Sequence, residues 1–177
     1  MKLFNIKKEI AFIEKDININ IDGLGIVMYS PKTVSYIKEG TDFLNDEFIK
    51  PEDVSKHVMD CDITGFCTGS PGNYILKIRY GYPSEEIESE YNIITRLGLK
   101  VKDNKVNFVD LYFLSGWNKE FNNEQIINVN NGFYHITCLT KKPESGKYGD
   151  NQVIYIYFNK LNSKAKLKYK GVPILYK

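Results

Sequence analysis

The chain has 177 residues, of which 42% are hydrophobic, 26% are charged and 14% are aromatic. These are ordinary values for a globular protein, and a chain of this length is expected to fold as a single domain over residues 1–177. A net charge of +2 does not indicate a dedicated nucleic-acid binder, and we expect no nucleic-acid partner.

The N-terminus and the cysteines indicate the compartment. Residues 1–16 are interrupted by charges every few positions, and no stretch approaches the roughly 20 apolar residues that a membrane span requires. Three cysteines are an odd number without the spacing of a disulfide framework, which is typical of a reducing compartment. We therefore expect a cytoplasmic protein with no membrane attachment.

The predicted strands follow from alternating apolar and polar residues between clusters of Gly, Pro, Asn and Asp. Two pairs of strands are expected to form hairpins, residues 17–21 with 26–30, and residues 132–140 with 152–158 across a long polar loop. In chain order the predicted strands are residues 4–14, 17–21, 26–30, 60–68, 74–80, 91–97, 99–101, 106–114, 126–129, 132–140, 152–158 and 164–170.

Other segments depart from this pattern. Pro51, followed by Glu52 and Asp53, is typical of a helix start, so one short helix is predicted from about Glu52 to Met59. Residues 81–90 are expected to be a solvated acidic turn. Residues 164–170 carry lysine at every second position, which favours a strand at a sheet edge because lysines repel an incoming strand.

This arrangement predicts an all-β fold with one or two short helices, an antiparallel β-sandwich. A Gly-x-Tyr pattern opens the predicted strands at Gly72 and at Gly132, sixty positions apart. The repetition favours two similar halves packed face to face, although Gly-x-Tyr is common before strands.

One hypothesis makes the chain a metal- or thiol-dependent hydrolase. His57, Cys61 and Cys67 fall within eleven positions, but a zinc site needs four ligands and usually a closer cysteine pair. Free cysteines are more often small buried residues. We therefore expect neither a metal nor another cofactor, and no catalytic residue is assigned.

Charge segregation is the feature that points to a partner. Eight acidic residues stand between Glu39 and Asp62 against two lysines, and nine lysines stand between Lys141 and Lys177 against two acids. Such segregation can steer an oppositely charged protein, although solvated faces also show it. Trp117, in a predicted loop, is a candidate interface anchor, with core packing as the alternative. The candidate partner-binding residues are Asp42, Asp46, Glu47, Glu52, Asp53 and Trp117.

The paired Gly-x-Tyr strands, residues 72–80 and 132–140, with a Leu-x-Val strand at 99–101 between them, resemble small bacterial β-sandwich proteins that include competence-type nuclease inhibitors and toxin-immunity proteins. The resemblance covers roughly the C-terminal two-thirds of the chain and carries over no functional residue. It implies a non-enzymatic inhibitor that blocks a toxin or nuclease by surface complementarity. A sandwich whose tyrosines line a carbohydrate or peptide groove is a third hypothesis.

Overall fold

Two β-sheets pack face to face in this computed structural model, which describes residues 10–120, 122–168 and 170–177. The five-stranded sheet has the order β1 (Lys15–Ile21), β4 (Gly72–Tyr80), β9 (Gln152–Leu161), β8 (Gly132–Thr140) and β5 (Ile93–Val101). The four-stranded sheet has the order β3 (Ile63–Cys67), β2 (Gly25–Tyr29), β6 (Lys105–Asp110) and β7 (Ile126–Asn128). The predicted all-β sandwich is confirmed.

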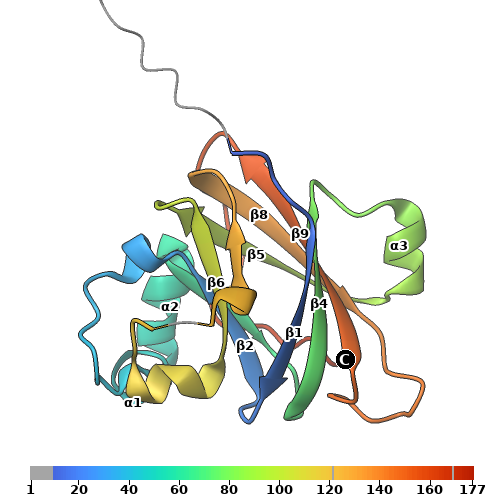
Figure 1. The fold of residues 1–177 in the computed structure, drawn as a ribbon, viewed down its shortest axis with the longest axis horizontal. Coiled ribbons are helices and arrows are strands. Elements are labelled where there is room, and N and C mark those ends of the chain that lie inside the picture. The colour runs from blue at the N-terminus through green and yellow to red at the C-terminus, as the bar shows by residue number, and fades with distance from the viewer. Residues whose placement is uncertain (1–9, 121, 169) are drawn as a thin grey trace, which may run out of the picture.

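Short helices flank the sheets (Figure 1). The α-helices are α1 (Phe43–Glu47), α2 (Pro51–Asp60) and α3 (Glu85–Glu90), and the 3-10 helices are η1 (Pro31–Val34), η2 (Leu111–Gly116) and η3 (Asn123–Gln125). Figure 1 shows α1 and α2 on one side of the sandwich and α3 on the other. None of the helices in the described part of the chain is long and apolar enough to cross a membrane.

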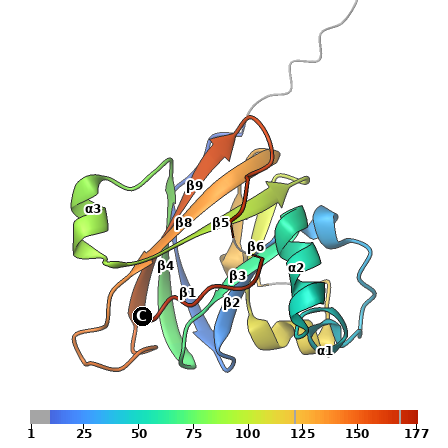
Figure 2. The same cartoon turned by 180° about the vertical axis from the view of Figure 1, so that it is seen from behind.

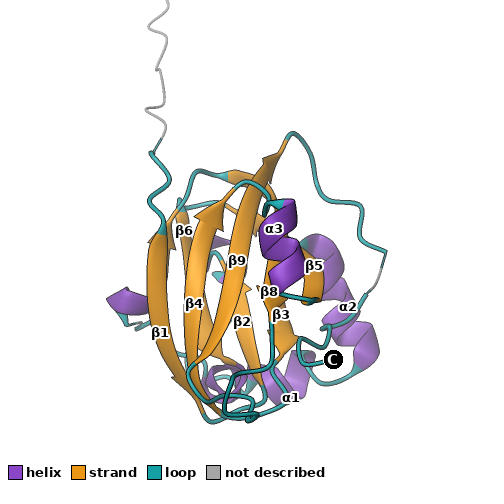
Figure 3. Cartoon of the chain, turned by 90° about the vertical axis from the view of Figure 1, so that its right-hand side faces the viewer, coloured by secondary structure: helices purple, strands orange, loops and turns teal. Residues whose placement is uncertain are grey.

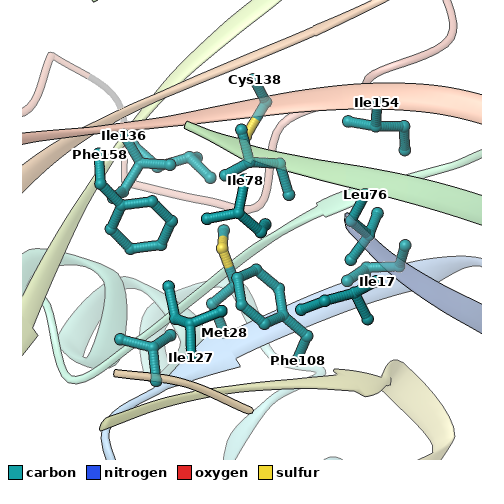
Figure 4. Packing of buried hydrophobic residues seen from close by; sticks show 14 of the residues in the cluster. Ile17, Met28, Leu76, Ile78, Phe108, Ile127, Ile136, Cys138, Ile154 and Phe158 are labelled. Atoms are coloured by element: carbon teal, nitrogen blue, oxygen red, sulfur yellow. The ribbon is translucent and has the colours of Figure 1, made fainter. Parts of the chain in front are cut away.

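The space between the sheets is filled by apolar side chains from alternate strand positions. β1 shows the principle, because its three isoleucines are buried while Asp16, Asn18 and Asn20 are exposed. Figure 4 shows Met28 and Phe108 of the four-stranded sheet facing Ile78 and Phe158 of the other. This interior contains no charged side chain among the described residues.

Strand β9 lies in the middle of the five-stranded sheet. It pairs parallel with β4 and antiparallel with β8, and the remaining strand pairings of the described residues are antiparallel. The predicted hairpin of β8 and β9 with a long loop is confirmed. That loop returns to the start of β4, where the Asn73 amide donates to the Gly149 carbonyl at 2.7 Å.

The two Gly-x-Tyr strands share a local structure, but they do not form two facing halves. Both β4 and β8 lie in the same sheet, on either side of β9. In each, the buried tyrosine donates a hydrogen bond to the carbonyl four residues earlier, Tyr74 to Ser70 at 2.7 Å and Tyr134 to Asn130 at 2.8 Å. These bonds fix the bend that leads into each strand, as a tyrosine corner does.

Four strand predictions need correction. β1 and β2 do not form a hairpin, because β1 pairs with β4 while β2 pairs with β3 and β6 in the other sheet. Residues 91–101 hold one continuous strand, β5, instead of two. The predicted strand 106–114 ends at Asp110, whose side chain accepts from the Tyr112 amide and caps η2. The predicted strand 4–14 falls largely outside the described residues, and residues 10–14 form no strand.

The lysine-rich tail and the acidic turn also differ from expectation. Residues 164–168 and 170 form no strand, and the segment lies against β5 and the end of α2 instead. An ideal Cβ at Gly98 would stand 3.2 Å from Leu167 and 2.9 Å from the Cys61 sulfur, which shows how closely this segment packs. Residues 81–90 include helix α3, capped by the Ser84 side chain.

We expect Phe158→Ala to lower the free energy of unfolding by about 3–5 kcal/mol. Phe158 is fully buried in the central strand, and its ring packs against Phe108 and Tyr134. Urea denaturation followed by circular dichroism measures the change. Tyr112→Ala, at a side chain that is 53% exposed, is the control and should change stability by less than about 0.5 kcal/mol. Equal losses in the two variants would contradict the assigned core.

Candidate functional site

The acidic segment, residues 42–62, forms a cover over the outer face of the four-stranded sheet. Its apolar side chains pack into a second core with residues of β2, β6 and η2. The members of this core are Val27, Tyr29, Val34, Ile37, Phe43, Phe48, Val54, Val58, Ile63, Val109, Leu114 and Trp117. The carboxylates of the segment therefore stand on a packed support.

Trp117 belongs to this support. Its side chain is 3% exposed, and its ring lies 5.1 Å from Tyr29 and 5.9 Å from Phe43 between ring centroids. Its backbone also joins η2 to the residues before α1, since its amide donates to Thr41 and its carbonyl accepts from Gly40. The near-complete burial of Trp117 favours the core role over the proposed role as an interface anchor.

Local signals position the two helices of the segment. Asp42 caps α1, accepting from the Asn45 amide at 3.2 Å. Pro51 begins α2, with Glu52 and Asp53 in its first turn, as predicted. At the other end, Cys61 takes a left-handed conformation with φ 57°, which ends the helix.

His57, a residue of α2, connects this helix to α1. The imidazole is 7% exposed; its Nε2 lies 3.3 Å from Glu47 of α1, and its Nδ1 lies 3.5 Å from Asp62 and 3.2 Å from the Tyr36 hydroxyl. Burial lowers the pKa of His57, but the hydrogen bonds and charges of Asp62 and Glu47 outweigh it, so the net pKa is raised. The ring lies between two carboxylates, and its protonated form offsets the repulsion between them.

The candidate carboxylates differ in how far they are already engaged. Asp42 serves as a helix cap, Asp53 pairs with Lys56 at 2.6 Å, and Glu47 contacts His57. Asp46 and Glu52 are exposed and form no ion pair with another described residue. These two are the carboxylates most available to a partner.

A groove of about 740 Å³ opens beside Glu52. It lies between the start of α2, the connection from α1, and the C-terminal segment, which passes next to α2 in Figure 2. Its walls are mainly apolar, and Ile49 is 57% exposed there. The lining residues are Phe48, Ile49, Pro51, Glu52, Val54, Ser55, Cys67, Leu111, Lys170, Gly171 and Val172.

The groove was not predicted from the sequence. Its lining comes from four regions that are far apart in the chain, around residues 48–55, at Cys67, at Leu111, and at 170–172. The one local signal is Ile49, an apolar residue between Phe48 and Lys50 that α1 and α2 leave exposed. The groove is lined by an acidic residue, Glu52, on one side and by a basic residue, Lys170, on the other.

The residues of the hydrolase hypothesis do not form a reactive site. The described residues contain no group of three His, Cys, Asp or Glu side chains that could hold a metal ion. Burial raises the pKa of the Cys61, Cys67 and Cys138 thiols, which disfavours the thiolate that a nucleophile needs. Cys61 faces β5, whereas Cys67 lies at the groove. The two thiols are therefore in different places.

Tyrosines do gather on the outer face of the five-stranded sheet. Tyr91, Tyr155 and Tyr157 form a row, with ring centroids 5.0 Å apart for the first pair and 6.1 Å for the second. Lys77 and Arg79 stand over the Tyr155 ring at 5.6 and 5.7 Å. Because these contacts already engage the central ring, a sugar or peptide would have to displace the cations before stacking on it.

Comparison with known proteins gives two solved structures of similar fold. No protein-family model matches the chain, and no curated protein matches it. A structure described as crocagin biosynthetic gene J has a TM-score of 0.52 at 9% identity, with 82% of this chain and 97% of that chain covered. ComJ from Bacillus subtilis, described as an inhibitor of the DNA-degrading activity of NucA, has a TM-score of 0.49 at 9% identity, with 86% and 100% covered. The first likeness shows the fold alone. The second places a nuclease inhibitor among the neighbours, as the resemblance seen in the sequence predicted.

We expect the two histidines to respond to pH in opposite directions. The folded-state pKa of His57 is raised above its ordinary value of about 6.5, whereas burial and the nearby Arg96 lower the pKa of His135. His57 therefore stabilises the fold fully below about pH 6.5, and this contribution is lost as the pH rises through its folded pKa. His135 contributes stability above about pH 6.5, and this is lost as the pH falls through its lower folded pKa.

NMR titration of the imidazole C–H signals checks this expectation directly, because the chain has two histidines. His57→Gln and His135→Gln assign the signals, and urea unfolding of both variants between about pH 5.5 and 8.5 gives the two stability profiles. Two histidines titrating together near pH 6.5 would contradict the network around His57.

Thiol labelling tests the assignment of the cysteines. In the native protein, an aromatic disulfide reagent should modify Cys67, which is half-buried, and should spare Cys61 and Cys138, which are fully buried. All three should react after unfolding. Cys67→Ser should abolish the native reaction, and rapid labelling of a second thiol in that variant would show that a buried cysteine is reactive.

Proposed function

We propose that the chain is a non-catalytic protein-binding domain, an inhibitor or immunity protein that blocks a toxin or nuclease. The observation that carries the proposal is the apolar groove of about 740 Å³, which the exposed Glu52 lines, on the segment that also carries the exposed Asp46. A groove of this size accommodates one or two large side chains. An anchor side chain buried in a pocket and surrounded by polar contacts is the usual arrangement at the centre of a protein interface.

The charges define the partner's chemistry. Asp46, Glu47 and Glu52 are exposed on α1 and the first turn of α2, so they favour a partner surface rich in lysine or arginine. Such charges raise the rate of association and select the orientation, while the buried anchor holds the complex. Many toxins and nucleases present basic surfaces to nucleic acid, which makes them suitable targets for such a site.

The support beneath the site is rigid, which favours a blocking role. Phe43 of α1 packs against Trp117, and His57 lies between Glu47 and Asp62. A surface that is already in its binding conformation loses less entropy when the partner arrives. A domain of this kind can act by covering a partner's surface, with no chemical step of its own.

Photo-crosslinking tests the groove. A benzophenone amino acid in place of Ile49 should capture one protein from lysate of the source cell, identified by mass spectrometry. The same substitution at Leu24, which is 50% exposed elsewhere, is the matched control and should not capture it. Equal capture from the two positions would remove the groove from the proposal.

Charge reversal then tests the electrostatic part on the identified protein. Asp46→Lys with Glu52→Lys should weaken binding at least about tenfold at low salt and less at high salt. Glu85→Lys with Glu86→Lys, exposed on α3, should leave binding unchanged. Finally, adding this protein at a saturating concentration should suppress the activity of the captured protein. Undiminished activity in the complex would overturn the inhibitory role while leaving the binding role intact.

A further inference from the structure

Edge strands expose unpaired backbone groups that attract another strand, and folded proteins normally protect them. Three of the four sheet edges here are covered or very short. At β5 the Lys100 amide donates to the Cys61 carbonyl at 2.7 Å, and at β3 the Cys67 amide donates to the Pro173 carbonyl at 2.8 Å. The third edge, β7, is a strand of three residues.

Strand β1 is different. Its seven residues pair with β4 on one side, and no backbone hydrogen bond to another described residue is found on its other side. It contains no proline, glycine or bulge, and its one charged residue on the core-facing side is Lys15, at its start. Figure 3 shows β1 at the margin of its sheet, with α2 on the far side of the molecule. Helix η3 lies beside β1, and the Lys15 ammonium donates to the Glu124 carbonyl at 2.8 Å and to the Ile126 carbonyl at 3.2 Å.

We propose that β1 is the interface at which two copies of this chain pair antiparallel, joining their five-stranded sheets into one continuous sheet. The sequence of β1 is self-complementary in this arrangement. Opposite residues of an antiparallel pair point to the same face, so isoleucine must meet isoleucine and asparagine must meet asparagine or aspartate. A two-fold axis through Asn18, the central residue of β1, satisfies this rule from Asp16 to Asn20 and sets Lys15 opposite Ile21 at each end.

In that register no like charges face each other. Ile17 lies opposite Ile19 of the second copy, Asn18 opposite Asn18, and Asp16 opposite Asn20. A shift that centred the pair on Ile19 would set Asp16 against Asp22 and would leave fewer residues paired. The Asp16 carboxylate is also neutralised within its own chain, because Arg79 lies 3.0 Å away.

The size of the contact sets the expected affinity. Pairing along one seven-residue edge buries much less than the roughly 1,600 Å² of a standard interface, so the dimer should dissociate at low concentration. The binding groove beside α2 stays free in the dimer, because it lies away from the β1 edge (Figure 3). This inference therefore does not depend on the proposed function.

Sedimentation velocity from micromolar to millimolar concentration tests the dimer with the full chain. Asn18→Lys sets two lysines opposite each other and should weaken dimerisation at least about tenfold, with partial recovery at high salt. Asn18→Asp should weaken it in the same way. An equimolar mixture of the two variants should dimerise again, because lysine then faces aspartate. Asn92→Lys, exposed next to the opposite edge of the sheet, is the control and should dimerise as the unaltered chain does.

Hydrogen exchange gives the second readout. The β1 amides that do not bond to β4 should exchange quickly in dilute protein and become protected as the concentration rises. A chain that stays monomeric at millimolar concentration would overturn the proposal, and so would edge amides that are protected at every concentration, or a dimer that the mixed variants fail to restore.

Discussion

The four-stranded sheet is buried on both of its faces, and this constraint determines where the acidic segment must lie. Every residue of β2 is buried, with Ile26 and Met28 facing the other sheet and Val27 and Tyr29 facing outward. A two-sided apolar strand needs a second cover, and α1, α2 and η2 supply it. The apolar side chains of the acidic segment cover the outer face of this sheet. The carboxylates that alternate with them are therefore left at the protein surface.

Much of the fold could be predicted from local patterns, because alternation reports which side chains of a strand face the core. It does not report which strand lies alongside. The alternation in β1 and the glycines between β1 and β2 are typical of a hairpin, yet the two strands belong to different sheets. Residues 164–168 alternate without any partner strand, so the pattern there reflects Ala165 and Leu167 lying against the body of the protein, with lysines outside.

The candidate site was predictable only in part. The acidic run and the start of α2 are local features, and the sequence located both. Burial of Trp117 depends on Tyr29 and Phe43, which are distant in the chain. The contacts of His57 with Glu47 and Asp62 also depend on how the segments fold together. So does the groove, whose two sides come from α2 and the C-terminal segment. Sequence spacing cannot supply such long-range proximity.

The central position of β9 has a consequence for synthesis of the protein. Its neighbours β4 and β8 precede it in the chain, and β9 ends at Leu161. While the chain emerges from the ribosome, β1 with β4 and β5 with β8 can form as separate pairs, each with the edge that β9 will join still open. Neither pair can close the sheet until residues 152–161 have left the exit tunnel. Until then the edges of β4 and β8 that β9 will join have no partner strand in the nascent chain, and chaperones protect such surfaces from aggregation.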